Sequence, residues 1–186
     1  MPVPVPPNAK RIFKSQRHEL WEWDQELYDG SHAVFSCAIR GDTVAVIPFL
    51  DKNTVLLIKE SQPGRSVPFM DVPGGMIDSE ERPEDTAKRE LREETGYQAS
   101  VLQFRENAHL GMTRFVEYVY LAKNLTNGQA AHLDAGEKIE LMPTPWKEAV
   151  AMSLRGELRR HEAMLAILAM EFDPEARALK ERFLNS

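Results

Sequence analysis

Residues Gly75 to Tyr97, GMIDSEERPEDTAKRELREETGY, form the stretch that decides the fold of this chain. Pro83 suits the first turn of a helix, where its missing N–H would have no partner anyway. The residues from Glu84 to Glu94 are all compatible with a helix. Gly96 stands where a helix often ends on a residue with positive φ. The stretch therefore predicts a short capped helix of about three turns, over residues 83–95.

The predicted helix carries three carboxylates on one flank. At about 100° per residue, Glu90, Glu93 and Glu94 lie side by side, next to a narrow apolar edge formed by Ala87 and Leu91. Like charges one turn apart cost about 0.2–0.5 kcal/mol when solvated, and several-fold more when partly buried. A divalent cation would offset this repulsion, because Mg²⁺ takes hard oxygen ligands. A solvated surface helix rich in Glu and Arg is the alternative interpretation.

The spacing of the fixed residues favours the first interpretation. Gly75 is followed after five residues by Glu81, and seven further residues lead to Arg89-Glu90-Leu91. One residue then separates this triplet from Glu93-Glu94, and one more separates that pair from Gly96-Tyr97. At every fixed position the segment resembles the Nudix box of the Nudix hydrolases. The resemblance implies a mixed α/β sandwich, with sheets covered by helices on their outer sides.

The same resemblance implies a site for Mg²⁺, or for Mn²⁺, at the box. Its expected ligands are the carbonyl of Gly74 and the carboxylates of Glu90, Glu93 and Glu94. Arg89, one turn before Glu93, can hold that carboxylate in place. Glu81 is expected to support the geometry between loop and helix.

Gly75 is a candidate substrate-binding residue, because glycine lets the backbone approach an ion or a phosphate closely. Three glutamates are candidates for the general base that takes a proton from an attacking water. They are Glu93 in the box, and Glu137 and Glu140 in the acidic segment after the loop 124–136. Each of the latter two could instead be an ordinary solvated glutamate.

Composition restricts the class of protein. The chain has 186 residues, which suits one domain with a full core, and a formal net charge of −6. It therefore lacks the basic field that binding to nucleic acid or to an anionic membrane would use. Cys37 is the single cysteine, so no intramolecular disulfide can form. No apolar run reaches the length of a membrane span. We expect a cytoplasmic protein that binds neither nucleic acid nor membrane.

The N-terminal part of the chain predicts strands. Residues 1–10 contain four prolines and are expected to form a flexible tail. Residues 11–41 predict an antiparallel β-meander, and residues 42–186 the Nudix hydrolase domain. In Nudix proteins that resemble ADP-ribose pyrophosphatases, such a meander builds a homodimer. Trp21 and Trp23 are then candidates for stacking on a nucleobase, or else they are core or interface residues.

The remaining segments predict further strands and a helical C-terminus. Strands are expected at 43–50, 55–60, 69–72, 101–104, 116–122 and 137–142, and helices at 146–154, 158–171 and 174–184. Arg65, in the loop-rich stretch 61–73, is a candidate for clamping a diphosphate, with a solvated arginine as the alternative. The segment 107–114, NAHLGMTR, lies between the strands expected at 101–104 and 116–122.

Together these observations predict a Mg²⁺-dependent hydrolase that cleaves the diphosphate bond of nucleoside diphosphate sugars. GDP-mannose, ADP-ribose and ADP-glucose types all remain open, because Leu110-Gly111-Met112-Thr113 stand where ADP-ribose pyrophosphatases typically have a proline. The products would be a nucleoside monophosphate and a sugar phosphate. The alternatives are a Nudix hydrolase of nucleoside triphosphates or capped RNA, and a non-catalytic nucleotide-sensing domain.

Overall fold

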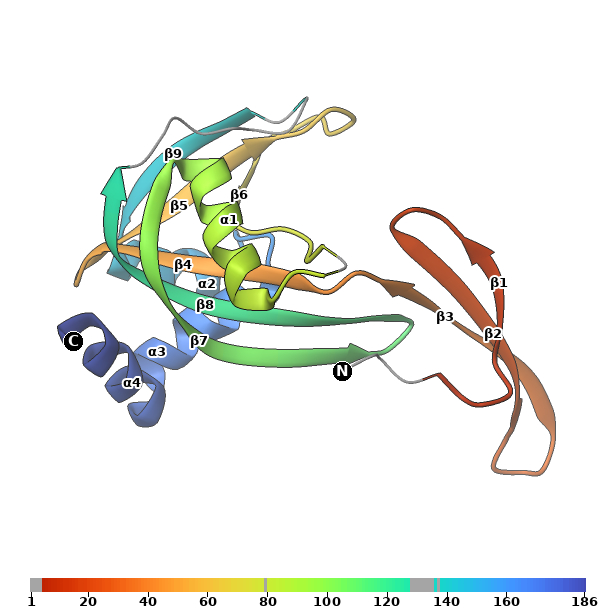
Figure 1. Ribbon diagram of the computed structural model, residues 1–186. Coiled ribbons are helices and arrows are strands. Elements are labelled where there is room, and N and C mark those ends of the chain that lie inside the picture. Colours follow the sequence, from red (N-terminus) through yellow and green to blue (C-terminus); the bar gives the residue numbers. More distant parts are fainter. Residues whose placement is uncertain (1–4, 79, 128–135, 137) are drawn as a thin grey trace.

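The computed structural model describes residues 5–78, 80–127, 136 and 138–186, and Figure 1 shows how its strands and helices are arranged. The strands are β1 (Lys10–Lys14), β2 (His18–Glu26), β3 (His32–Arg40), β4 (Thr43–Asp51), β5 (Thr54–Ser61), β6 (Phe69–Asp71), β7 (Tyr97–Leu110), β8 (Thr113–Asn127) and β9 (Lys138–Pro145). The helices are α1 (Pro83–Thr95), α2 (Trp146–Leu154), α3 (His161–Phe172) and α4 (Pro174–Asn185). None of these helices is long and apolar enough to span a membrane.

The strands form one continuous mixed sheet that curls through the molecule (Figure 1). Its order is β1-β2-β3-β8-β4-β5-β6, with β7 paired to β8 and β9 paired to β5. β8 runs parallel to β3 and β4, whereas the other pairs are antiparallel. The predicted mixed α/β architecture with an N-terminal antiparallel meander is therefore confirmed.

β4 lies between two apolar cores. Val44 and Val46 pack on one face against Leu91 of α1, whereas Ala45 and Ile47 pack on the other face against α2 and α3. All five side chains are fully buried, and burying each larger one contributes about 1.5–3 kcal/mol. The helices on both faces explain why this strand is a continuous apolar run rather than an alternating one.

Most predicted elements agree with the structure, and two are longer than expected. The bounds of α1 and α2 are those predicted. The strands predicted at 101–104 and 116–122 are the longer ones, because β7 and β8 continue through the segment 107–114 as a long hairpin. Its strands alternate exposed and partly buried residues, and its many polar side chains hide that period. β1 adds a strand of five exposed residues to the predicted meander.

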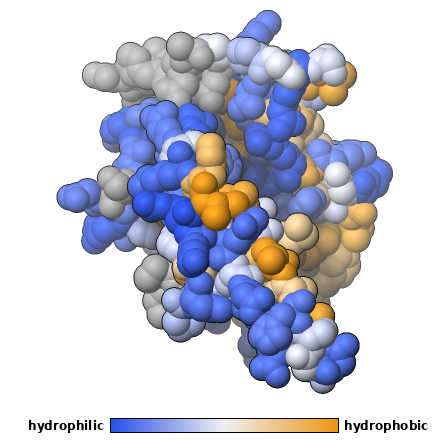
Figure 2. All heavy atoms as spheres, turned by 90° about the vertical axis from the view of Figure 1, so that its right-hand side faces the viewer, coloured by the Kyte–Doolittle hydropathy of each residue, from blue (hydrophilic) through white to orange (hydrophobic). Residues whose placement is uncertain are grey.

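β1, β2 and β3 form an arm that stands out from the body (Figure 1). The arm joins the body where Ala38 of β3 pairs with Thr113 of β8. Figure 2 shows apolar atoms between hydrophilic ones on the face that carries the arm. The exposed apolar residues of the arm include Ile12, Phe13, Val34 and Phe35.

Candidate active site

The loop before α1 is fastened to β4 by backbone hydrogen bonds. The amides of Val44 and Val46 donate to the carbonyls of Gly75 (2.9 Å) and Pro73 (2.8 Å). Gly74 has a φ of +152°, and a Cβ built on it would lie 2.2 Å from the carbonyl oxygen of Val44. A side chain is therefore excluded at Gly74 both by the backbone conformation and by the close approach of the loop to β4.

α1 directs two buried carboxylates at this loop. The side chain of Glu90 is 13% exposed. Glu94 as a whole residue is 8% exposed. Oε2 of Glu94 accepts a hydrogen bond from the amide of Gly74 at 3.0 Å. A Cβ on Gly75 would lie 2.2 Å from Oε1 of Glu90, so this glycine makes room for the carboxylate. Glu93 is more exposed, at 33% of its side chain.

Arg89 connects the carboxylates of the box. Its guanidinium donates to Glu90 and to Glu93 at 2.9 Å each, and to Glu81 at 3.0 Å. Burial alone would lower the pKa of Arg89, but the bonds with Glu81 and the two other carboxylates raise it. The contact with Glu93 is the one that the helical spacing predicts. The contact with Glu81 shows how that residue ties the loop to α1.

A second arginine, which the sequence did not single out, enters the site from the segment just before α3. Nη2 of Arg160 donates to the carbonyl oxygen of Gly74. Its backbone amide donates to Asp71 at 3.2 Å, and its Nε lies 3.4 Å from the same carboxylate. Nη1 lies 4.0 Å from Glu117 of β8, and only 18% of the side chain is exposed. Arg160 thus joins β6, β8 and the Gly74 loop.

Four acidic side chains lie around Arg160, and burial acts on the pKa of each of them. Burial raises the pKa values of Asp71, Glu90 and Glu117, and raises that of Glu94 well above its usual range. The charge of Arg160 lowers all four values in part. Four acidic groups therefore lie around Arg160 in a poorly solvated space, where Arg89 also contacts Glu90 and Arg40 also acts on Glu117.

This excess of buried carboxylate oxygens fits a divalent cation. Hard oxygen donors suit Mg²⁺, which usually keeps several waters and needs only one or two carboxylates. Among the described residues, no three Asp, Glu, His or Cys side chains already converge as a metal site. Arg89 donates hydrogen bonds to Glu90 and Glu93, and the Gly74 amide donates one to Glu94. Gly74, Glu90, Glu93 and Glu94 thus lie near one another, linked through Arg89 and the Gly74 amide, and their role as metal ligands stays a prediction.

The structure does not bring Glu140, another predicted base, to this place. Glu140 keeps 65% of its side chain exposed and lies 4.0 Å from Lys59, its partner across β5 and β9. The neighbouring Glu60 is buried and points to the opposite face of the sheet. Glu60 helps to raise the pKa of Glu94, so the face of β5 that carries Glu60 is the one turned towards the box. Glu140 lies opposite Lys59 on the other face and therefore points away from the box. Glu137 lies outside the described residues.

Arg65 lies at the edge of the site, in contact with an aromatic ring. Its guanidinium is 5.0 Å from the ring centre of Phe69, and that of Arg159 is 4.7 Å from the same ring. Phe69 and Asp71 share one face of β6, about 7 Å apart along the strand. The two exposed arginines are therefore near neighbours of the buried cluster around Arg160.

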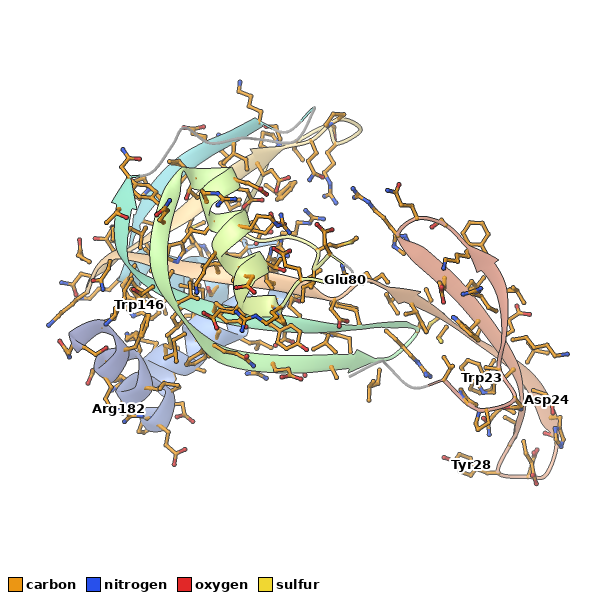
Figure 3. The ribbon with its side chains drawn as sticks, viewed as in Figure 1. Trp23, Asp24, Tyr28, Glu80, Trp146 and Arg182 are labelled. Carbon is orange, nitrogen blue, oxygen red and sulfur yellow. The ribbon has the colours of Figure 1, made fainter. Side chains whose placement is uncertain are left out.

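The two tryptophans of the arm do not reach α1 within one chain. Trp23 is 8% exposed and contacts Phe35 of β3 and Arg114 of β8. Figure 3 shows it well away from the loop marked by Glu80, which leads into α1. Trp21 is partly buried and donates to Glu19 at 3.0 Å. Any contact of these rings with a substrate would have to involve the site of a partner subunit.

Several functional candidates were missed at the sequence level: Glu60, Asp71, Glu117 and Arg160. Glu60, Asp71 and Glu117 are acidic residues at buried positions of strands. A charge at an inward position of an otherwise apolar strand is the signal that could have marked them, since such groups are rarely buried without a partner. Arg160 precedes a helix and gives no such signal.

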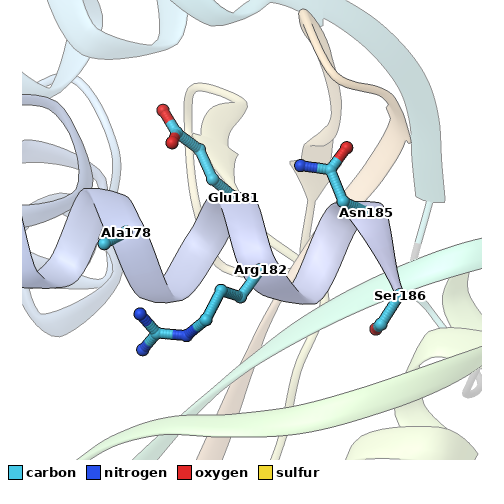
Figure 4. Close-up of a pocket in the computed structure, with 5 residues that line it drawn as sticks. All are labelled: Ala178, Glu181, Arg182, Asn185 and Ser186. Atoms are coloured by element: carbon cyan, nitrogen blue, oxygen red, sulfur yellow. The ribbon is translucent and has the colours of Figure 1, made fainter.

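A shallow hollow lies along α4 at the C-terminus (Figure 4). Its lining residues are Ala178, Glu181, Arg182, Asn185 and Ser186. Figure 3 places Arg182 on the far side of the molecule from the Glu80 loop. The hollow therefore takes no part in the site at α1.

Comparison with known proteins defines the class. The NUDIX domain model matches residues 39–165, so the chain belongs to the Nudix family. It is a hydrolase of this family, as the box and the fold together indicated.

Two relatives and one solved structure show which Nudix proteins it is similar to. The ADP-ribose pyrophosphatase of Bacillus subtilis (strain 168) is 26% identical over 174 residues, covering 92% of this chain and 94% of the relative. The ADP-sugar pyrophosphatase of Mus musculus is 39% identical over 66 residues, covering 33% and 30%. A crystal structure of an ADP compounds hydrolase superposes with a TM-score of 0.74 at 18% identity, covering 89% of this chain and 90% of that one.

Proposed function

We propose that this protein hydrolyses the diphosphate bond of nucleoside diphosphate sugars with the help of Mg²⁺ or Mn²⁺. The observation that carries the proposal is the burial of Glu90 and Glu94 against the Gly74 loop, with more carboxylates than guanidiniums around them. The similarity to pyrophosphatases of ADP-ribose and ADP-sugars supports this substrate class. ADP-ribose, ADP-glucose and GDP-mannose types are the candidates, and the products are a nucleoside monophosphate and a sugar phosphate.

Each residue of the box has its own proposed role. Glu90, Glu94 and the Gly74 carbonyl would hold the cations, which supply charge neutralisation for the diphosphate oxygens. Arg89 fixes the orientation of Glu90 and Glu93. Gly75 leaves its backbone accessible to a phosphate. Glu93 is more exposed than Glu90 and Glu94, so it is our candidate for the base that takes a proton from the attacking water.

Arg65 and Arg159 are our candidates for holding the diphosphate. Among the described residues, neither guanidinium forms an ion pair, and both lie over Phe69. Cation–π contacts at exposed sites are worth only about 0.5–1 kcal/mol each. Two like charges at one ring repel each other, and an anion between them would relieve that repulsion. A guanidinium fork suits a phosphate group in this role.

We expect Arg65→Gln and Arg159→Gln each to raise KM for a nucleoside diphosphate sugar about tenfold, roughly 1.4 kcal/mol, with kcat nearly unchanged. The reason is that both residues would bind the ground state and the transition state equally. Steady-state kinetics with Arg155→Gln as a surface control tests this expectation. A fall in kcat at constant KM would contradict a pure binding role.

The substrate class is tested with a panel of ADP-ribose, ADP-glucose, GDP-mannose, UDP-glucose, GTP and a capped RNA, each with and without Mg²⁺. Cleavage of one or more sugar diphosphates only when Mg²⁺ is present is the expected result. Cleavage of GTP or capped RNA alone would replace the proposed substrate class. Binding of a nucleotide sugar without turnover would instead indicate a nucleotide-sensing domain.

We also propose that the arm of β1–β3 forms a homodimer, in which Trp21 faces the partner's site, whereas Trp23 packs within its own protomer. The exposed Ile12, Phe13 and Val34 support this proposal, because interface cores are enriched in such residues. Light scattering after size exclusion should give twice the mass of the chain, and Phe13→Asp should reduce it to the single mass. A monomeric wild-type protein would remove the argument for Trp21. A cytoplasmic location stays a prediction.

A further inference from the structure

Arg160 lies where a bound cation would lie. Its guanidinium contacts the carbonyl oxygen of Gly74, which is the backbone ligand expected for a metal ion. It also lies among Asp71, Glu90, Glu94 and Glu117, all of which favour its charged form electrostatically. Arg160 lies outside the Nudix box, which ends at Tyr97. A permanent positive charge is thus built into the acidic cluster by the segment before α3.

We propose that Arg160 acts as a tethered cation that competes with the divalent metal for the same ligands and so sets the metal affinity of the site. The inference rests on the proposed function in one respect, because it takes Gly74 and Glu94 as metal ligands. In this role Arg160 is a positioning residue. It holds the Gly74 loop and the buried carboxylates in place before a metal arrives.

Two physical effects follow from this placement. First, buried carboxylates without a countercharge would be strongly destabilising, so Arg160 stabilises the metal-free protein. Second, two cations within a few ångströms in a poorly solvated space repel each other strongly. The same guanidinium that permits folding without metal therefore weakens metal binding. A residue with only a structural role would produce the first effect without the second.

The binding of Mn²⁺ alone tests the proposal, with no substrate present. We expect Arg160→Gln to lower the dissociation constant for Mn²⁺ about tenfold, because a like charge next to the metal ligands is removed. Isothermal titration calorimetry, or the loss of the free Mn²⁺ signal in electron paramagnetic resonance, measures the change. Arg182→Gln on α4 removes the same charge far from the site and should bind Mn²⁺ like the wild type.

Thermal unfolding gives a second, independent result. We expect the metal-free Arg160→Gln protein to melt at a lower temperature than the wild type, and added Mn²⁺ to raise its Tm by more than it raises the wild-type Tm. A variant that is unfolded without Mn²⁺ and folds when Mn²⁺ is added would support the proposal equally. Arg160→Lys keeps the charge, so its affinity for Mn²⁺ should stay within about threefold of the wild type.

Three outcomes would overturn the inference: an unchanged or weaker affinity for Mn²⁺ in Arg160→Gln, an equal gain in Arg182→Gln, or a variant that stays unfolded at every Mn²⁺ concentration. These outcomes are separable from a failure of the proposed function. A substrate panel without cleavage, combined with tighter Mn²⁺ binding by Arg160→Gln, would remove the substrate class and leave the role of Arg160 intact. Cleavage by the wild type, combined with an unchanged Mn²⁺ affinity in Arg160→Gln, would leave the substrate class intact and remove the proposed role of Arg160.

Discussion

Replacing Glu94 with Gln should reduce kcat about a thousandfold or more, equivalent to ~4 kcal/mol of lost transition-state stabilisation. Glu94 is buried between α1 and the Gly74 loop, where its charge is needed to hold a divalent cation. Gln keeps the size of the side chain and can still accept the hydrogen bond from the Gly74 amide. The fold should therefore survive, and the change in rate should report the lost charge alone.

Glu84→Gln is the matched control for this experiment. Glu84 lies on the same helix, in the first turn, and forms an exposed pair with Lys88. Such a pair contributes about 0.3–0.5 kcal/mol to stability and nothing to the site. Turnover of Glu84→Gln should equal that of the wild type at saturating Mg²⁺. If Glu94→Gln kept near-normal activity with a native circular dichroism spectrum, the assignment of the box carboxylates would be wrong.

Gly74→Ala should lower the free energy of unfolding by about 3 kcal/mol or more and abolish activity. The added Cβ would lie 2.2 Å from the Val44 carbonyl oxygen, which is a backbone atom that no rotamer change can move. The φ of +152° adds conformational strain for any residue with a side chain. Relief of this contact would pull the loop from β4 and displace the Gly74 carbonyl from the site.

Gly111→Ala provides the comparison for urea or thermal unfolding. Gly111 lies at the turn between β7 and β8, with no positive φ and no atom within 4 Å of the added Cβ. Its unfolding free energy should stay within about 0.5 kcal/mol of the wild-type value. Similar stabilities for Gly74→Ala and Gly111→Ala would show that the Gly74 loop does not pack on β4 as described.

The local part of the site could be predicted from the sequence because its residues lie within one helical segment. The bounds of α1 follow from Pro83 and Gly96, and the flank of Glu90, Glu93 and Glu94 follows from helical geometry alone. Gly96 has the positive φ, +75°, that its place after the helix predicts. Spacing along a single helix fixes distances without any knowledge of the tertiary fold.

The surroundings of the box could not be predicted in this way. Asp71, Glu117 and Arg160 come from β6, β8 and the segment just before α3, and they meet only because the sheet curls around the loop. Glu140 is the opposite case, because the sequence suggested it for the site and the fold places it elsewhere. It follows a loop and looks accessible in the sequence, but its register opposite Lys59 turns it away from α1. A shift of one residue in this register would have reversed its face.

The proposed reaction is tested most directly by the ³¹P NMR spectrum of ADP-ribose and of GDP-mannose incubated with the protein, with and without Mg²⁺. We expect the diphosphate signals of at least one compound to be replaced by the signals of two phosphomonoesters, only when Mg²⁺ is present. Glu94→Gln should not produce these signals. Diphosphate signals that persist with Mg²⁺ in both samples would contradict the proposed reaction.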